Sequence, residues 1–142
     1  MIENITDGIL AAIREEFGEG YTLYTEAVKQ GLKEPCFFIT CISPNIRLYR
    51  GRRYLHTNGY TIQYLTDAAE PRAECAAVAE RLFGCLELIT VDEDLMRGTG
   101  MNADIVAEDG LLNFTVNYDF FSYRPNEETK MDEFEGETTL KG

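Results

Sequence analysis

The 142-residue sequence lacks most of the residues and runs on which catalytic and membrane functions depend. Its one histidine is His56, and its two serines, Ser43 and Ser122, stand outside the G-x-S-x-G setting of a nucleophilic serine. No apolar run approaches the roughly 20 residues of a membrane-spanning helix. Residues 1–9 carry acids where a secretory signal carries bases, so we expect no export by that route. The sequence therefore offers no recognisable active site and no membrane span.

The remaining chemical motifs are weak. Asp92, Glu93 and Asp94 could hold Mg²⁺ with water filling the other positions, but three adjacent acids are more often a solvated turn or a helix start. Residues 97–100 read RGTG and lack the lysine and the spacing of a phosphate loop. His56 has no cysteine or acid at ligand spacing and is predicted to lie exposed in a loop. We therefore expect no enzymatic activity, no metal and no cofactor.

The four cysteines lie in apolar segments and form no C-x-x-C pair. Cys36 and Cys41 are five residues apart on a predicted strand and should point to opposite faces. We interpret all four, Cys75 and Cys85 included, as reduced thiols in the core of a cytoplasmic protein.

Charge is strongly unbalanced, with 25 acids against 13 bases and a net charge of −12. This balance disfavours general binding to a phosphate backbone, so we expect no sequence-specific nucleic-acid partner. Residues 126–142 hold six of the acids and two of the bases, and the remaining body carries a net charge of −8. Within that acidic body, four arginines fall inside seven residues: Arg47, Arg50, Arg52 and Arg53.

Apolar periodicity predicts two helices. The stretch 70–89 is the element around which the rest of the chain is predicted to pack, and Pro71 suits its first turn. A second helix is predicted over 2–17, ending at Gly18 and Gly20. Its apolar stripe comprises Ile2, Ile5, Ile9, Ala12, Ile13 and Phe17. The apolar stripe of the 70–89 helix has helical spacing and comprises Cys75, Val78, Ala79, Leu82, Phe83 and Leu86.

Strand signals occupy most of the remaining chain. Residues 36–42 are apolar on both faces, which predicts a strand central in its sheet. Residues 112–120 alternate apolar and polar side chains, which predicts a strand with one buried face. Further strands are predicted at 21–25, on both sides of the arginines and at 60–65, with turns at 43–45, 58–59 and 108–110 and an irregular or short-strand segment over 91–100.

This order predicts an α+β fold, a mainly antiparallel sheet with two helices packed on it. We expect one domain over 1–125, followed by an acidic C-terminal segment, 126–142, that has little to bury and should be disordered alone.

Three interpretations of the arginine cluster remain open. It could be a solvated hairpin with local ion pairs worth about 0–1 kcal/mol each. It could bind nucleic acid, with Tyr49 and Tyr54 offering stacking surfaces, although the surrounding acids would repel phosphates. It could also contact acids on another copy, because a basic projection on an acidic body is self-complementary in head-to-tail packing. The last interpretation makes Asp92, Glu93 and Asp94 the candidate partners of the arginines.

Four segments together resemble the tail terminator, or tail completion, proteins of Gram-positive phages and prophages: 21–39, 76–89, 97–106 and 111–118. The run 28–38, VKQGLKEPCFF, is the most distinctive, because no general folding requirement dictates it. The resemblance covers about residues 8–124. It implies a non-enzymatic α+β protein that forms a hexameric ring, caps the tail tube and presents a surface to the head–tail connector.

The favoured function is therefore a structural tail protein, assembled in the host cytoplasm and then part of the virion tail. Its expected partners are copies of itself, the tail tube protein and the head–tail connector protein. A small cytoplasmic adaptor or binding domain of prophage origin is the alternative, and a metal-dependent enzyme using Asp92–Asp94 is a third. A closed ring in solution would favour the first over the other two.

Overall fold

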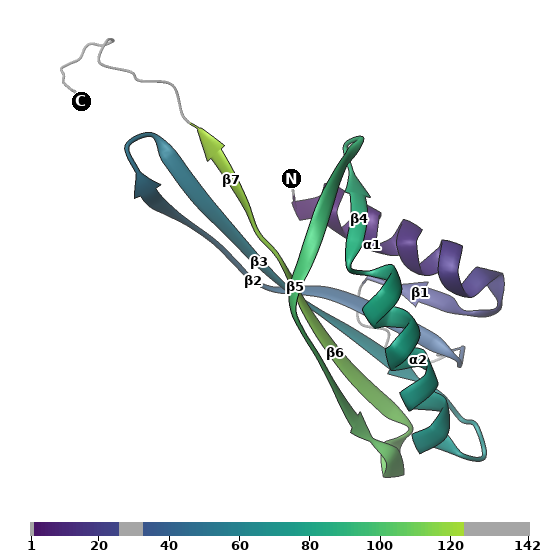
Figure 1. The fold of residues 1–142 in the computed structure, drawn as a ribbon. Coiled ribbons are helices and arrows are strands. Elements are labelled where there is room, and N and C mark those ends of the chain that lie inside the picture. The colour runs from purple at the N-terminus through teal and green to yellow at the C-terminus, as the bar shows by residue number, and fades with distance from the viewer. Residues whose placement is uncertain (1, 26–32, 124–142) are drawn as a thin grey trace. The chain divides into compact units, whose positions relative to one another are not determined.

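Two helices and seven strands make up most of residues 2–25 and 33–123, the ranges that the computed structural model describes (Figure 1). No helix in these ranges is long and apolar enough to cross a membrane. In chain order the helices and strands are α1 (Ile2–Phe17), β1 (Thr22–Tyr24), β2 (Cys36–Arg50), β3 (Arg53–Leu65), α2 (Pro71–Cys85), β4 (Leu88–Val91), β5 (Asp94–Val106), β6 (Leu111–Tyr118) and β7 (Phe120–Tyr123).

The strands form one mainly antiparallel sheet in the order β1-β2-β3-β6-β5-β4, and β7 pairs with β3. Only the short β1 is parallel to its neighbour β2 among the pairings with a defined register. At the centre, β3 and β6 place Ile62 opposite Phe114. The predicted α+β class is therefore confirmed.

The described chain divides into two compact units, and strands β2 and β3 each contribute residues to both. The core unit comprises residues 1–44 and 57–119, and the hairpin unit begins with residues 45–56 and resumes at 120. The predicted division into a domain over 1–125 and a C-terminal segment stays a prediction, because 124–142 lie outside the described residues.

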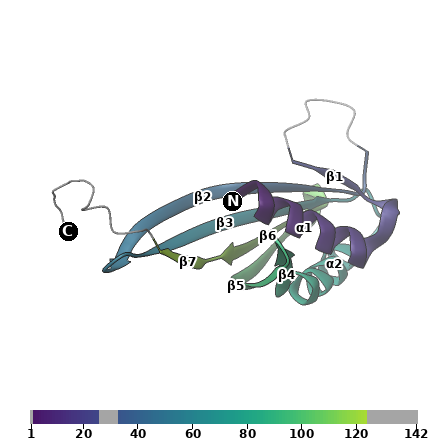
Figure 2. The ribbon, with the colours of Figure 1, turned by 90° about the horizontal axis from the view of Figure 1, so that it is seen from above.

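Both helices lie on the same face of the core unit's sheet (Figure 2). In α1, Ile5, Ile9, Ile13 and Phe17 recur every four residues and are all buried, as the sequence predicts. In α2 the buried residues are Cys75, Val78, Ala79 and Leu82, followed by Leu86 just beyond the helix end.

Two predictions about α2 are wrong. The helix ends at Cys85, so the predicted final residues up to 89 belong to a turn and to β4. Phe83 was expected at the middle of the buried stripe, but its side chain is 38% exposed. Its ring instead contacts Phe114 edge-on, with ring centroids 5.0 Å apart. Phe83 therefore marks the margin of the helix–sheet contact rather than its centre.

The core combines aliphatic and aromatic side chains, and its tyrosine hydroxyls have hydrogen-bond partners. The Phe37 ring lies 5.0 Å from Phe17 and 4.9 Å from Tyr64, centroid to centroid. The Tyr64 hydroxyl donates to Glu74 Oε2 at 2.7 Å, and the Tyr118 hydroxyl donates to the Leu86 carbonyl at 2.6 Å. Burial of these hydroxyls raises the pKa of both tyrosines.

Strand β2 is longer and less buried than predicted. Its first residues, Cys36 and Phe37, are buried on successive positions, so both faces are covered there. Further along, Ile42 is exposed, and β2 lies second from the sheet edge rather than at its centre. The predicted turn at 43–45 is wrong, because β2 runs through those residues. The predicted cover on both faces is therefore found only at the start of the strand, and the predicted central position in the sheet is wrong.

The predicted turn at Asn58-Gly59 is also wrong, since both residues lie within β3. The Asn58 side chain donates to the Tyr118 carbonyl at 3.0 Å, and its backbone N–H donates to Asp119 Oδ1 at 3.3 Å. A Cβ on Gly59 would meet Asn117 Oδ1 at 3.2 Å, so glycine allows a close strand approach here. Side-chain contacts across the sheet therefore explain a pair that usually signals a turn.

The hairpin between β5 and β6 is confirmed at 108–110. Gly110 adopts φ 61°, and its N–H donates to the Ala107 carbonyl at 3.1 Å. Four of the predicted inward residues of β6 are buried: Leu112, Phe114, Val116 and Tyr118. Phe120, the predicted fifth, belongs to β7 and is only half-buried. The segment 91–100, expected to be irregular or a short strand, instead contains the end of β4 and half of β5.

All four cysteines lie in the described ranges and are free. Cys36 and Cys75 are buried, as expected of core thiols, whereas Cys41 and Cys85 are half-buried.

Candidate subunit interface

The arginine cluster, Arg47, Arg50, Arg52 and Arg53, lies at the turn between β2 and β3 in the hairpin unit. Gly51 adopts φ 59° there, a conformation that glycine reaches without strain. Arg47, Arg50 and Arg52 are exposed, and none of them has an ion-pair partner among the described residues. The turn therefore presents three solvated guanidinium groups.

Arg53 differs from the other three arginines because its guanidinium packs on aromatic rings. Its Cζ lies 3.9 Å from the centroid of Phe121 and 5.5 Å from that of Tyr49. The two rings are themselves 5.1 Å apart in an edge-on arrangement. Its Nε is buried without a hydrogen-bond partner in the described part of the chain. Arg53 therefore contributes to packing within the hairpin unit through cation–π contacts.

The hairpin unit also exposes large apolar side chains, a feature that the sequence reasoning missed. Leu48 is 58% exposed and Tyr49 is 51% exposed, although both lie between arginines. Such a concentration of apolar side chains in one small unit is typical of a contact surface. The full exposed set in this unit is Ile46, Leu48, Tyr49, Phe121 and Tyr123.

His56 does not lie in an exposed loop as predicted. It is a half-buried residue of β3, stacked on Phe120 with ring centroids 4.3 Å apart. Its Nε2 lies 2.7 Å from the Ser122 hydroxyl. Strand β7, which pairs His56 directly with Phe120, supplies both contacts, and its pairing with β3 could not be read from the local sequence.

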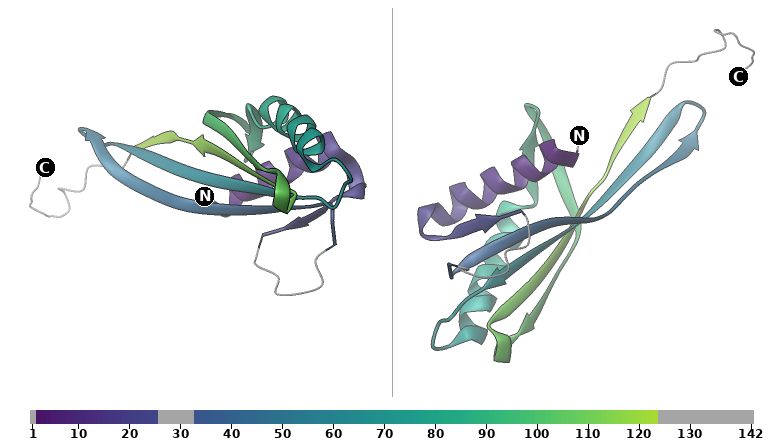
Figure 3. Two further views of the ribbon diagram at one scale, coloured as in Figure 1. Left: turned by 90° about the horizontal axis from the view of Figure 1, so that it is seen from below. Right: turned by 180° about the vertical axis from the view of Figure 1, so that it is seen from behind.

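The acidic turn, Asp92, Glu93 and Asp94, joins β4 to β5 in the core unit. Val91 pairs with Asp94, so the loop has two residues, Asp92 with φ 52° and Glu93 with φ 72°. Positive φ at both central positions defines a type I′ turn, whose twist suits a two-residue hairpin. The Asn4 amide donates to Asp92 Oδ2 at 2.8 Å and ties the turn to the beginning of α1, which lies near the tip of this hairpin (Figure 3).

A metal site at the acidic turn has no support in the geometry. No group of three or more His, Cys, Asp or Glu side chains within the described ranges is placed to hold a metal ion. The three acids are exposed. The three acids therefore lie in a solvated hairpin turn, one of the two ordinary structures expected of such a run.

The ion pairs within residues 2–25 and 33–123 involve neither the arginine cluster nor the acidic turn. They join Arg81 to Glu16 at 3.0 Å and Arg97 to Glu87 at 2.8 Å, all four side chains being well exposed. The cluster and the turn belong to different units, and their predicted contact across copies stays a prediction.

The chain matches the model of a protein family described as phage tail terminator protein, over residues 4–130. No curated protein matches the chain significantly. The match spans most of the sequence, including all but the first two residues of α1, the whole of α2 and all seven strands described above. The chain therefore belongs to the phage tail terminator family. It is a structural protein of the phage tail, and its family implies contacts with other tail or head proteins.

Proposed function

We propose that this protein ends growth of the tail tube by forming a closed ring, of six copies, on the tube's last layer. One side of the ring binds the tail tube protein and the other binds the head–tail connector protein. The protein assembles in the host cytoplasm, remains in the virion tail and has no enzymatic activity. Membership of the tail terminator family is the observation that carries this proposal.

The charges and apolar residues described above support contact between copies. Arg47, Arg50 and Arg52 are exposed on the hairpin unit and have no ion-pair partners in the described ranges. The three acids of the acidic turn, in the core unit, are likewise exposed and form no ion pair there. Opposite charges on two surfaces of one chain make head-to-tail contact between copies favourable, and such contacts form a ring when the rotation from copy to copy closes. The arginine forks can bind carboxylates with two hydrogen bonds each. We therefore assign the arginine cluster and the acidic turn to opposite sides of the subunit contact.

The first test measures the mass of the full chain by native mass spectrometry, alone and after mixing with tail tubes of the same phage. The expected result is a closed ring, at least in the presence of tubes. A protein that stays monomeric in both conditions would contradict the proposal and favour the alternative of a small adaptor domain. Electron microscopy of the mixture should show tubes with one capped end and a fixed length.

The second test reverses the charge of three arginines, Arg47→Glu, Arg50→Glu and Arg52→Glu. Arg53 stays unchanged, because its stacking on Phe121 stabilises the hairpin unit itself. Rings should be lost while the thermal unfolding curve is kept, and raised salt should weaken wild-type rings in the same direction.

The matched control makes the same change in net charge at exposed bases elsewhere, with Arg14→Glu, Lys33→Glu and Arg72→Glu. The control should still form rings. Assembly of the arginine-cluster variant at the wild-type level would remove the cluster from the interface. If replacing all three acids of the turn by lysine restores assembly of that variant, the acidic turn is its partner.

A further inference from the structure

The chain leaves its last strand, β7, beside the arginine cluster. Strand β7 runs antiparallel to β3, and its last residue, Tyr123, pairs with Arg53, the first residue of β3. The chain therefore leaves β7 at the end of the hairpin unit that carries the turn between β2 and β3. The acidic C-terminal segment, 126–142, follows two residues later. It is thus tethered within a few residues of all four arginines.

Charge sets the hairpin unit apart from the rest of the protein. Its described residues, 45–56 and 120–123, hold four arginines and no acid. The sequence of the core unit, 1–44 and 57–119, holds 19 acids against six bases, and the C-terminal segment holds six acids against two bases. An acidic segment tethered beside four arginines is attracted to them and repelled by the core unit.

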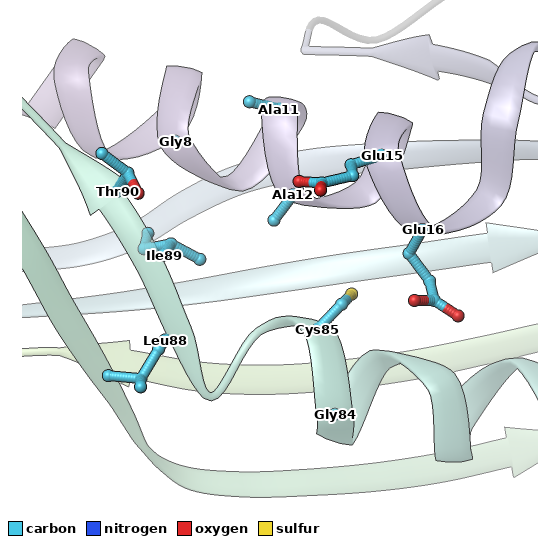
Figure 4. Close-up of a pocket in the computed structure, with 10 residues that line it drawn as sticks. All are labelled: Gly8, Ala11, Ala12, Glu15, Glu16, Gly84, Cys85, Leu88, Ile89 and Thr90. Atoms are coloured by element: carbon cyan, nitrogen blue, oxygen red, sulfur yellow. The ribbon is translucent and has the colours of Figure 1, made fainter. Parts of the chain in front are cut away.

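The pocket of the core unit does not suit an acidic occupant (Figure 4). Its volume is about 490 Å³, and α1, the end of α2 and β4 form its walls. Two glutamates, Glu15 and Glu16, are the charged residues of its lining, which contains no base. Like charges disfavour binding of the C-terminal segment there. The hairpin unit is the better surface for it.

The hairpin unit also exposes aromatic rings next to its arginines. The rings of Tyr49 and Phe121 lie 5.1 Å apart, and the Arg53 guanidinium lies over both. Tyr123, two residues after Phe121, points to the same side of β7. The exposed fractions are 51% for Tyr49, 42% for Phe121 and 71% for Tyr123. We call the surface formed by Tyr49, Arg53, Phe121 and Tyr123 the aromatic face.

The C-terminal segment has a complementary pattern. Phe134 stands between Glu133 and Glu135, and Glu127 and Glu128 come seven and six residues before it. An aromatic ring can pack on the aromatic face edge-on or offset. Carboxylates on both sides of that ring can then bind arginine forks with two hydrogen bonds each. The segment therefore offers one apolar contact and two pairs of acids.

The length of chain between the two surfaces allows these contacts. Four residues separate Tyr123 from Glu127 and can span at most about 14 Å, enough to reach Arg50 and Arg52 at the neighbouring turn. Eleven residues lead from Tyr123 to Phe134, and a coil of that length spans about 18 Å on average. A tether this short gives an effective concentration of the order of millimolar.

We propose that the C-terminal segment of each copy binds the hairpin unit of the same copy. Phe134 packs on the aromatic face. Glu133 and Glu135 bind Arg47, which strand alternation places on the same side of β2 as Tyr49. Glu127 and Glu128 bind Arg50 and Arg52, which lie at the turn.

This binding has a consequence for assembly that rests on the proposed ring. The C-terminal segment and the acidic turn of the next copy compete for the same arginines, so a chain whose arginines are covered cannot make the subunit contact. The segment therefore raises the concentration at which copies assemble.

Photo-cross-linking tests the contact in the full chain. Benzoylphenylalanine replaces Phe134 in an equal mixture of unlabelled and isotope-labelled chains, at a concentration where the protein is monomeric. Cross-links should join position 134 to residues 45–56 or 120–123 of a chain with the same label. The matched control places the probe at Leu140, which has no acid beside it, and should give a clearly lower yield.

Neutralising the C-terminal segment tests its effect on the arginines and on assembly. The segment variant carries six changes in the full chain: Glu127→Gln, Glu128→Gln, Asp132→Asn, Glu133→Gln, Glu135→Gln and Glu137→Gln. The matched control carries the same number and kind of changes at exposed acids of the core unit: Glu15→Gln, Glu19→Gln, Glu70→Gln, Glu80→Gln, Asp104→Asn and Glu108→Gln.

In NMR spectra the backbone amide signals of residues 47–53 should move in the segment variant and stay in place in the control. Raised salt should move the wild-type signals toward those of the segment variant, because it screens the same attraction. If the segment covers the arginines in about 70–90% of free chains, the concentration needed for rings should fall by about three- to tenfold in the segment variant. The control should form rings at the wild-type concentration.

The outcomes separate this inference from the proposed function. Cross-links that join only chains of different label, or amide signals that do not move, would overturn binding within one copy and leave the ring untouched. A segment variant with moved signals and an unchanged concentration for rings would overturn the competition. If no chain forms rings, even on tubes, while the same-label cross-link and the moved signals are found, the proposed function fails and the binding stands.

Discussion

Two glycines of the helices, Gly8 and Gly84, provide a sharp test of the packing of α1 on β4. Alanine is favoured over glycine in a helix by about 1 kcal/mol, so each Gly→Ala change gains about this much locally. At Gly84 nothing lies within 4 Å of the added Cβ, so the gain should survive. At Gly8 the Cβ would lie 2.7 Å from the Thr90 oxygen and 3.2 Å from Val91 Cγ2. Backbone must move to admit it, and such overpacking costs about 1–3 kcal/mol.

Gly84→Ala should therefore raise the free energy of unfolding by up to about 1 kcal/mol, while Gly8→Ala should lower it by up to about 2 kcal/mol. The propensity gain cancels in the difference between the variants, which isolates the cost of overpacking. For a chain of this length the midpoints of thermal unfolding should differ by about 3–10 °C. Circular dichroism during heating and urea titration measures both quantities. If Gly8→Ala proves as stable as Gly84→Ala, the described contact between α1 and β4 is wrong.

Two further predictions concern the core. Leu82→Ala should lower the free energy of unfolding by about 2–5 kcal/mol and Glu80→Ala, on the exposed face of α2, by less than about 0.5 kcal/mol, so equal urea midpoints would show that the assigned helix face is wrong. Burial, aided by Glu16, raises the pKa of Cys85 from 9.0 to about 12, and burial raises that of Tyr60 from 10.0 to about 12. Because the unfolded chain loses these protons first, stability should be constant up to about pH 9 and fall between pH 9 and 12, and a flat alkaline profile would contradict the described burial.

Local patterns predicted the elements that bury one clean face. The isoleucines of α1 and the alternating residues of β6 have one dominant period each, and the structure buries those residues. The turn at 108–110 was predicted correctly because a glycine between two strand patterns favours a turn, and Gly110 adopts the left-handed conformation that glycine reaches without strain. In α2 the stripe was right up to Leu82, but the adjacent Phe83 lies at the margin of the sheet, and sequence spacing cannot locate that margin.

The turn errors both concern residues within strands, and at Asn58 the structure shows the physical cause. Pro44 and the pair Asn58-Gly59 were taken as turn residues, yet both lie within long strands. At Asn58 the side chain reaches the Tyr118 carbonyl, which is 60 residues away in sequence. Local preference was overridden by hydrogen bonds across the sheet, which become visible only once the strand order is known.

The candidate interface was only half predictable. Clustered arginines and adjacent acids can be read directly from the sequence, and the structure exposes most of them. The packing of Arg53 on Phe121 depends on the pairing of β7 with β3. Exposed Leu48 and Tyr49 could have been suspected, since they alternate with charges in a segment short of buried positions.

The backbone of the acidic turn allows its charge to be separated from its fold. Glu93 adopts φ 72°, where a residue with a Cβ is disfavoured by about 1–2 kcal/mol, and type I′ turns prefer Asn-Gly. The double variant Asp92→Asn, Glu93→Gly therefore keeps the turn, and the new amide oxygen can still accept the hydrogen bond from Asn4. Thermal unfolding should show a monomer that is as stable as wild type or up to about 1 kcal/mol more stable.

Ring formation should change in the opposite direction, because two of the three carboxylates proposed to bind arginines are gone. We expect rings to weaken at low salt and to lose most of their salt dependence, measured by native mass spectrometry over a salt series. Glu93 occupies a position whose backbone conformation favours glycine, and a carboxylate needed for contact between copies would explain its presence there. A more stable variant that assembles as wild type does would show that the acidic turn serves only as a hairpin connection.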